Sequence, residues 1–119
     1  MRHKVNQQLK FNHKDKDHRK AALKNLLTSF FVHKSLIVTQ KRAKAIAMFV
    51  DKLVNVVNTK DKMNAIRFVS RYLFTKESSL ELFNNVAPKY TKNKSGITRV
   101  TPIKLRIGDG AKLVKIELI

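Results

Sequence analysis

The sequence predicts an α+β fold in which about four helices pack on one face of a small mixed sheet of about three strands. Apolar residues recur every three or four positions in several stretches before residue 88, which is typical of amphipathic helices. A β-branched run at residues 35–39 and alternating apolar residues after residue 97 favour strands. Because 119 residues suffice for one hydrophobic core, we expect a single globular domain over residues 17–119.

The first 16 residues are expected to form an extended basic arm in front of this domain. Their only large apolar side chains after Met1 are Val5, Leu9 and Phe11, and these follow no helical or strand period. Such a segment buries too little surface to offset its ordering entropy. We expect the arm to order on a partner; a frayed terminus without a role is the alternative.

A helix, a short strand and a long helix follow the arm. The first helix should begin with Asp17 as its N-cap, and its apolar face comprises Ala22, Leu23, Leu26, Leu27 and Phe30. The run Ser35 to Thr39 is too short for a helix and is expected to be a buried strand. Thr39 should cap a helix over residues 40–58, whose core-facing residues are Ala43, Ile46, Ala47, Val50, Leu53, Val54 and Val57.

Two further helices are predicted after a polar break. Residues 62–74 have helical spacing, with Met63, Ile66, Val69, Ser70 and Leu73 on one side and Ala65, Phe68 and Tyr72 widening it. Thr75 should cap a shorter helix to about residue 87, with Leu80, Phe83 and Val86 facing the core, and Pro88 should end it. All phenylalanines except Phe11 are expected in the core.

The remainder of the chain predicts a basic loop and a β-hairpin. Residues 89–96 are polar and basic and end in Gly, as loops do. Then Ile103, Leu105 and Ile107 alternate with Lys104 and Arg106, which predicts one apolar and one cationic row. The Gly108-Asp109-Gly110 turn should return the chain as a strand over residues 111–118, with Val114, Ile116 and Leu118 on one face.

Charge is the unusual property of the composition. The chain has 26 Lys and Arg against 8 Asp and Glu, a net charge of +18. Such a surplus favours a polyanionic partner that neutralises it. There is no cysteine for a disulfide or a thiolate metal site, and no apolar run is long enough to span a bilayer. We therefore expect a cytoplasmic protein.

Few side chains are suited to catalysis or to cofactor binding. The eight carboxylates are scattered at helix starts, turns and solvated faces, and none pairs as acid and base. The four histidines lack zinc-ligand spacing, and the three glycines do not form a phosphate-binding loop. We expect no enzymatic activity, no metal, no cofactor and no small-molecule substrate.

The cations gather in the arm, in the first helix and at the start of the second. Carboxylates at helical spacing would make these clusters ordinary solvated faces, but almost none are present, so phosphate binding is the better interpretation. Lysine predominates, which suggests positioning on a nucleic-acid backbone more than reading of bases. Phe11 and Tyr90 stand alone among polar residues and are candidates for stacking on unpaired bases.

Three alternatives to RNA binding remain. A DNA-binding protein could use the same charge, but no helix presents an Arg, Asn and Gln set suited to base edges. An enzyme acting on RNA lacks an acid, a base and a metal set. A membrane-surface role is weaker still, since the cations surround a globular core instead of lining one isolated amphipathic helix.

The sequence resembles a known family along its whole length. The matching strings are Met1-Arg2-His3, His18-Arg19-Lys20-Ala21, Asn25-Leu26, Thr28-Ser29, His33, Ile37-Val38-Thr39, Ala43-Lys44, Leu82-Phe83, Ala87-Pro88-Lys89-Tyr90, Gly96-Ile97-Thr98-Arg99-Val100, Gly108-Asp109 and Ile116-Glu117-Leu118. In order and spacing they resemble the bacterial large-subunit ribosomal protein seventeen family. Where that family commonly has Tyr after the glycine, this chain has Ile97.

The resemblance implies a monomeric, non-catalytic ribosomal component that binds large-subunit ribosomal RNA near the outer end of the peptide exit tunnel, beside neighbouring ribosomal proteins. It also implies an N-terminal extension that reaches into RNA. From charge and resemblance together, the residues expected to contact RNA are Arg2, His3, Lys4, Lys10, Phe11, Lys14, Lys16, His18, Arg19, Lys20, Lys24, Asn25, Lys41, Arg42, Lys44, Lys89, Tyr90, Lys92, Lys94, Arg99, Lys104 and Arg106.

Overall fold

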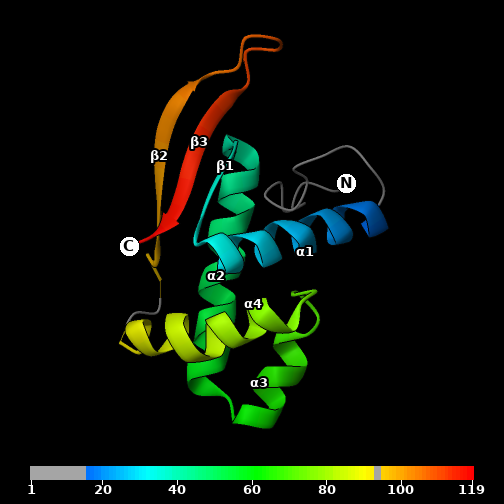
Figure 1. Ribbon diagram of the computed structural model, residues 1–119, viewed down its shortest axis with the longest axis vertical. Helices are drawn as coiled ribbons and strands as arrows, with labels where there is room; N and C mark the ends of the chain where they lie inside the picture. Colours follow the sequence, from blue (N-terminus) through cyan, green and yellow to red (C-terminus); the bar gives the residue numbers. More distant parts are fainter. Residues whose placement is uncertain (1–15, 93–94) are drawn as a thin grey trace, which may run out of the picture.

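The computed structural model describes residues 16–92 and 95–119, and over them it confirms the α+β class (Figure 1). The elements in chain order are α1 (Lys16–His33), β1 (Ser35–Thr39), α2 (Gln40–Thr59), α3 (Lys62–Val69), α4 (Lys76–Glu81), a π-helical turn (Leu82–Val86), a 3-10 turn (Ala87–Tyr90), β2 (Thr98–Leu105) and β3 (Lys112–Leu118). The predicted arm, residues 1–16, lies outside the described residues except for Lys16, which begins α1. Asp17 therefore lies in the first turn of α1 instead of capping it.

The three strands form one sheet in the order β1-β3-β2, and both pairings are antiparallel. The sheet is therefore antiparallel throughout, and the predicted mixed sheet is wrong in this detail. The two ends of the chain segment 35–118 meet in it, since Leu36 pairs with Ile116 and Val38 with Val114. The ladder between β2 and β3 slips by one residue between Pro102 and Lys104, where Pro102 has no amide to donate.

Helices cover one face of this sheet and leave the other open. On the central strand β3, Val114 and Ile116 are buried, whereas Lys115 and Glu117 on the opposite face form an ion pair at 3.6 Å with both side chains partly exposed. Ile37 of β1 lies on the open face and is 63% exposed, so β1 is half-buried, not fully buried as predicted. The side-chain period of two in strands explains this alternation.

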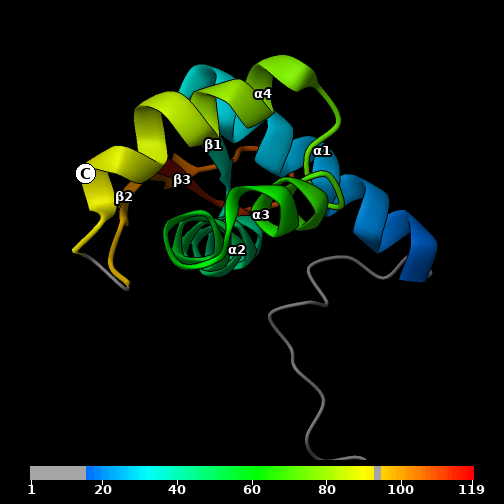
Figure 2. The ribbon, with the colours of Figure 1, turned by 90° about the horizontal axis from the view of Figure 1, so that it is seen from below.

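The long helix α2 connects all parts of the core. It runs along the sheet, and in the view from below it is seen nearly end-on, with α1 and α4 together beside it (Figure 2). Its buried residues are Ala43, Ala45, Ile46, Phe49, Val50, Leu53 and Val54, and they pack against Leu23, Leu27, Phe30 and Phe31 of α1. Each fully buried Leu or Phe side chain contributes about 2 kcal/mol to folding. The predicted core faces of α1 and α2 are thus confirmed.

The core faces of the two short helices differ from the prediction. In α3, Ala65 and Val69 are buried, while Met63 and Ile66 are exposed. Leu80 of α4 is 49% exposed, and Leu82 takes its place in the core. The π-helical turn Leu82–Val86 adds a residue to the helical turn, which shifts the apolar stripe away from the regular period. Pro88 lies inside the 3-10 turn that follows, so the helical path continues to Tyr90.

The β2–β3 hairpin extends beyond the N-terminal end of α2, toward the top of Figure 1. Its predicted apolar row is therefore not covered by helices: Ile103 and Leu105 are exposed, and Ile107 is 99% exposed. Phe74 likewise is exposed, in the loop before α4, instead of belonging to the core.

Candidate nucleic-acid interface

Helix α1 presents its cations on the side away from its buried face. Lys16, His18 and Lys20 are exposed, as is Asn25, while Arg19 is half-buried. Leu23 and Leu27 fix this orientation, because they are buried against α2 on the other side of the helix. The prediction that α1 has one apolar and one cationic face is confirmed.

Lys24 occupies the border between the two faces of α1. Its ammonium lies 4.4 Å from the centroid of the Phe74 ring, a cation–π contact that holds the charge at the surface. The Thr28 hydroxyl, one turn later, donates to the Lys24 carbonyl oxygen at 2.8 Å and accepts from the Phe74 amide at 3.0 Å. These contacts connect the loop before α4 to the cationic helix at Lys24 and Thr28.

The start of α2 combines cations with a helix N-terminus. Lys41, Arg42 and Lys44 are exposed there, and the first turn contains no acidic residue. Thr39 is at the predicted cap position, but its side chain makes no capping hydrogen bond. The amide groups of the first turn and the positive end of the helix dipole attract anions and repel the nearby lysines. This site is therefore favourable for a bound phosphate.

The structure brings two of the predicted cations together from distant parts of the chain. A hollow of about 360 Å³ lies between β1, the start of α2 and the outer end of the hairpin; it is lined by Ile37, Val38, Thr39, Arg42, Arg106 and Leu113. Arg42 and Arg106 thus share one concave surface, although they are far apart in the sequence. We call the surface around this hollow the basic region shared by the start of α2 and the hairpin.

Arg106 is not a free cation in this region. Its guanidinium donates to both carboxylate oxygens of Asp109, at 2.9 and 2.6 Å, and this pairing lowers the pKa of Asp109 well below its ordinary value. The Asp109 carboxylate also accepts from the Ala111 amide, which stabilises the hairpin turn. Arg106 therefore stabilises the hairpin turn, and its contact with an external anion would be a secondary role.

On the remainder of the hairpin, Arg99 and Lys104 are exposed on β2, which is an edge strand. Neither takes part in an ion pair that the described part of the chain contains. Cations on an edge strand also hinder pairing with another sheet.

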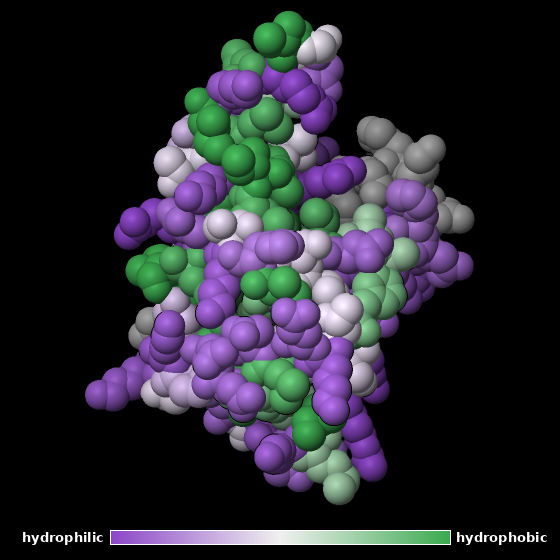
Figure 3. Space-filling model, in the orientation of Figure 1, coloured by the Kyte–Doolittle hydropathy of each residue, from purple (hydrophilic) through white to green (hydrophobic). Residues whose placement is uncertain are grey.

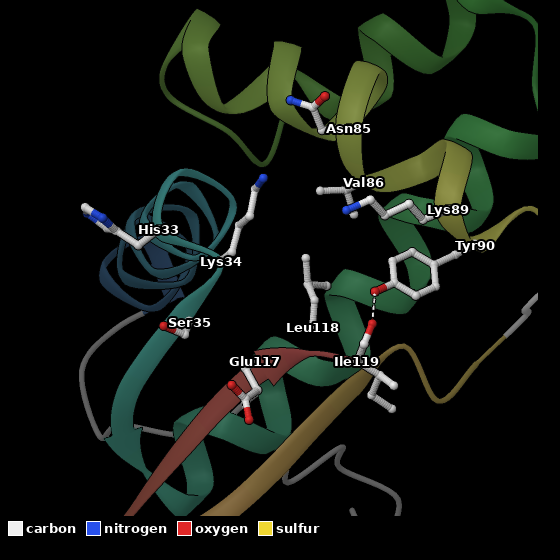
Figure 4. A pocket seen from close by; sticks show the side chains of 10 residues that line it. All are labelled: His33, Lys34, Ser35, Asn85, Val86, Lys89, Tyr90, Glu117, Leu118 and Ile119. Carbon is white, nitrogen blue, oxygen red and sulfur yellow. Dashed lines mark hydrogen bonds between the residues drawn. The ribbon is translucent and has the colours of Figure 1, made fainter.

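A cleft of about 350 Å³ opens near the end of β3 (Figure 4). Lys89 lines it beside Val86 and Tyr90, whereas His33 and Lys34 lie across the cleft, and Glu117 lies below Ser35 in this view. The Lys34 ammonium contacts Glu81 at 3.4 Å, and the Asn85 side chain donates to the same carboxylate at 2.8 Å; these contacts lower the pKa of Glu81, the Asn85 bond most strongly. Lys34 was not among the predicted contact residues, although it lines this cleft. Only its position directly after the first predicted helix could have pointed to it.

Tyr90, a candidate for stacking on unpaired bases, has its ring in the core and not on the surface. The ring is 7% exposed and belongs to the hydrophobic core. Its hydroxyl donates to the main-chain oxygen of Ile119 at 2.5 Å, and burial raises the pKa of the phenol (Figure 4). Tyr90 therefore joins the 3-10 turn to the end of β3. Lys92, two residues later, is exposed.

Several predicted contact residues lie outside the described part of the chain: Arg2, His3, Lys4, Lys10, Phe11, Lys14 and Lys94. Residues 16–92 and 95–119 contain no group of three or more His, Asp or Glu side chains that could hold a metal ion. In the same residues, every helix is too short or too polar to cross a lipid bilayer.

Comparison with known proteins identifies the family. The family model for Ribosomal protein L17 matches residues 22–119. The "Large ribosomal subunit protein bL17" of Clostridium kluyveri is 40% identical over 103 residues, covering 87% of this chain and 90% of the relative. The protein of the same name from Desulforudis audaxviator is 38% identical over 103 residues, covering 87% and 91%, and that of Desulforamulus reducens is 36% identical over 102 residues, covering 86% and 90%. The chain belongs to the ribosomal protein L17 family.

Proposed function

We propose that this protein is a structural, non-catalytic constituent of the bacterial large ribosomal subunit, located in the cytoplasm within the ribosome. It binds large-subunit ribosomal RNA as a monomer, through contacts between its cations and RNA phosphates. Membership of the L17 family supports this proposal, since the relatives are named as large-subunit proteins. The net charge of +18 supports an RNA partner independently.

The observation that carries the RNA-binding proposal is the start of α2. Lys41 and Arg42 lie in the first turn, where the helix dipole already repels cations and where no acidic residue is present. This arrangement lowers the stability of the isolated protein by a few tenths of a kcal/mol for each cation. A phosphate placed at this turn would receive both the amide donors and the side-chain charges.

The proposed contact surface has three parts on the described chain: the outer face of α1, the basic region shared by the start of α2 and the hairpin, and the rim of the cleft at Lys89. The arm over residues 1–16 adds a fourth part that reaches into RNA. The proposed position is near the outer end of the peptide exit tunnel, beside other large-subunit proteins. The resemblance of the chain to its family supports this position.

The experiment is reconstitution with purified large-subunit ribosomal RNA. The full chain, produced with a tag that can be removed, is mixed with the RNA and with an equal mass of duplex DNA as competitor. We expect one protein per RNA after washing in high salt, no displacement by the DNA, and crosslinks from α1 to the RNA around the tunnel exit. Displacement by duplex DNA, or binding of several copies per RNA, contradicts the proposal.

A further inference from the structure

A second concave basic surface lies at α3, a segment for which no RNA contact was predicted. It is a hollow of about 600 Å³, and six residues line it: Lys60, Asp61, Asn64, Arg67, Phe68 and Arg71. Three of them are cations and one is an anion. We call these six residues the α3 groove. The α3 end of the molecule is mostly hydrophilic, in contrast to the apolar side chains at the hairpin end (Figure 3).

The α3 groove contains two arginines, Arg67 and Arg71, and one carboxylate, Asp61. Arg67 lies in α3 and Arg71 lies in the turn that follows, four positions later; both side chains are exposed. Neither forms an ion pair within residues 16–92 and 95–119. Two like charges that line one hollow repel each other, so the pair is weakly unfavourable without a ligand. An anionic ligand would remove this repulsion.

An aromatic cluster fixes the position of the groove's charges. The Phe68 ring packs on Tyr72 with 5.4 Å between centroids, and Tyr72 packs on Phe49 of α2 at 5.5 Å. The ammonium groups of Lys60 and Lys52 lie 5.3 and 5.6 Å from the Phe68 centroid. Because Phe68 packs against the core and lines the hollow, its cation–π contact keeps the Lys60 ammonium at the hollow.

The side chains of the groove suit an RNA strand better than a simple anion. Arginine forks match phosphate oxygens in pairs, and two forks four positions apart can engage neighbouring phosphates. The Asn64 amide offers a donor and an acceptor for a sugar or a base edge. Asp61 would repel a phosphate at its own position, but it can accept a hydrogen bond from a ribose 2′-hydroxyl, which DNA lacks.

The groove is too far from the start of α2 to serve the same RNA segment. Helix α2 separates them, and its 20 residues span about 30 Å. Figure 1 shows α3 and the hairpin tip at opposite ends of the longest axis. We propose that the α3 groove binds the phosphate backbone of a second segment of ribosomal RNA, so that the protein joins two RNA segments. This inference rests on the proposed function and specifies a further binding site for it.

Hydroxyl-radical footprinting of the full chain on large-subunit RNA tests this inference. The variant is Arg67→Gln with Arg71→Gln, and the matched control is Lys62→Gln with Lys76→Gln, which removes the same charge from two exposed positions that line neither the α3 groove nor another proposed contact. We expect the wild type to protect two separate sets of nucleotides. The arginine variant should lose one set, keep the other, and bind about tenfold or more weakly at 0.1 M salt, while the control keeps both sets.

A second measurement does not depend on removing the arginines. The chain contains no cysteine, so Asn64→Cys introduces a single attachment point for an iron chelate that cleaves nearby RNA. Cleavage should fall in the set of nucleotides that the arginine variant exposes. The inference is overturned if the arginine variant protects RNA as the control does, or if the chelate at position 64 cleaves nothing. If the wild type itself protects no nucleotides, the proposed function fails as well.

Discussion

The Tyr90 hydroxyl donates a hydrogen bond to the main-chain oxygen of Ile119, 29 positions later, at 2.5 Å. This bond connects the last helical turn to the end of β3, and the Ile119 amide in turn donates to the Ile97 carbonyl oxygen at 3.0 Å. Ile97 is fully buried. A residue expected to touch RNA is therefore part of the structure that closes the sheet onto the helices.

Replacing Tyr90 with Phe tests this role. The ring still fills the core, but the hydroxyl bond is lost, so the free energy of unfolding should fall by about 1 kcal/mol. For a domain of this size the midpoint of thermal unfolding should drop by about 4 °C. Calorimetry measures both quantities. An unchanged midpoint would show that the hydrogen bond does not stabilise the fold.

Lys34 provides a test of backbone strain. It follows α1 with a φ of 64°, and its amide donates to the Phe30 carbonyl at 2.6 Å, as in a helix C-terminus that usually carries Gly. Lys34→Gly and Lys34→Ala both remove the contact with Glu81, so their difference isolates the backbone term. The Gly variant should be more stable than the Ala variant by about 1 kcal/mol in denaturant unfolding. Equal stabilities would contradict the left-handed conformation at this position.

Asp51 should make stability depend on pH. Burial raises the pKa of its carboxyl above the ordinary value of 3.8, and main-chain amides at Ile97 and Gly96 only partly offset this. A raised pKa means that the folded state binds the proton more tightly, so stability decreases as the pH rises from about 3.8 through the folded pKa. Asp51→Asn should therefore be more stable than the wild type at pH 7.

The advantage of the Asp51→Asn variant should disappear below pH 3.8, where the carboxyl of the wild type is protonated in both states. Denaturant unfolding at both pH values measures the two differences. A variant that is less stable than the wild type at pH 7 would show that the ionised carboxylate contributes more through its hydrogen bonds than its burial costs.

The start of α2 can be tested for binding and stability together. Lys41→Gln with Lys44→Gln removes two cations near the positive end of the helix dipole, so the free energy of unfolding should not fall. RNA affinity should fall, and the slope of log affinity against log salt should shrink by about 1.4 to 1.8. Filter binding at several salt concentrations measures the slope. The control Lys62→Gln with Lys76→Gln should keep the wild-type slope. Equal slopes in the two variants would show that the start of α2 does not contact RNA.

The sequence was sufficient to predict elements that depend on local periodicity. Helix α2 and the core face of α1 follow from apolar spacing, and Val114 and Ile116 face the core as alternation predicted. Thr75 caps α4 as expected, because its hydroxyl accepts from the Ser78 amide three residues later. These features depend on neighbours within a few positions, which the sequence displays directly.

Features that depend on distant contacts could not be predicted in this way. Tyr90 is buried because the end of β3 meets it, and no local pattern contains that information. Leu80 is exposed because a π-helical turn changes the helical phase after it. Ile107 is exposed because the hairpin extends past α2. The burial of Ile107 therefore depends on the length of the hairpin relative to α2, a separate helix.

The sequence predicted the parts of the candidate interface where cations stand next to one another. It did not predict the α3 groove, whose cations are several positions apart. Lys41, Arg42 and Lys44 stand close together in sequence, and their exposure agrees with the prediction. Arg67 and Arg71 are separated by aromatic and small residues, so the basic character of the α3 groove emerges only in three dimensions. The available signal was their spacing of four, with no carboxylate three or four positions from either arginine.

The salt dependence of binding to large-subunit ribosomal RNA tests the central claim most directly. If about six phosphates are neutralised by side-chain cations, the affinity of the full chain should fall about a thousandfold between 50 and 200 mM salt. The wild type is measured at four or more salt concentrations, with the RNA held folded by constant magnesium. An affinity that changes less than about threefold over this range would contradict an interface built from cations and RNA phosphates.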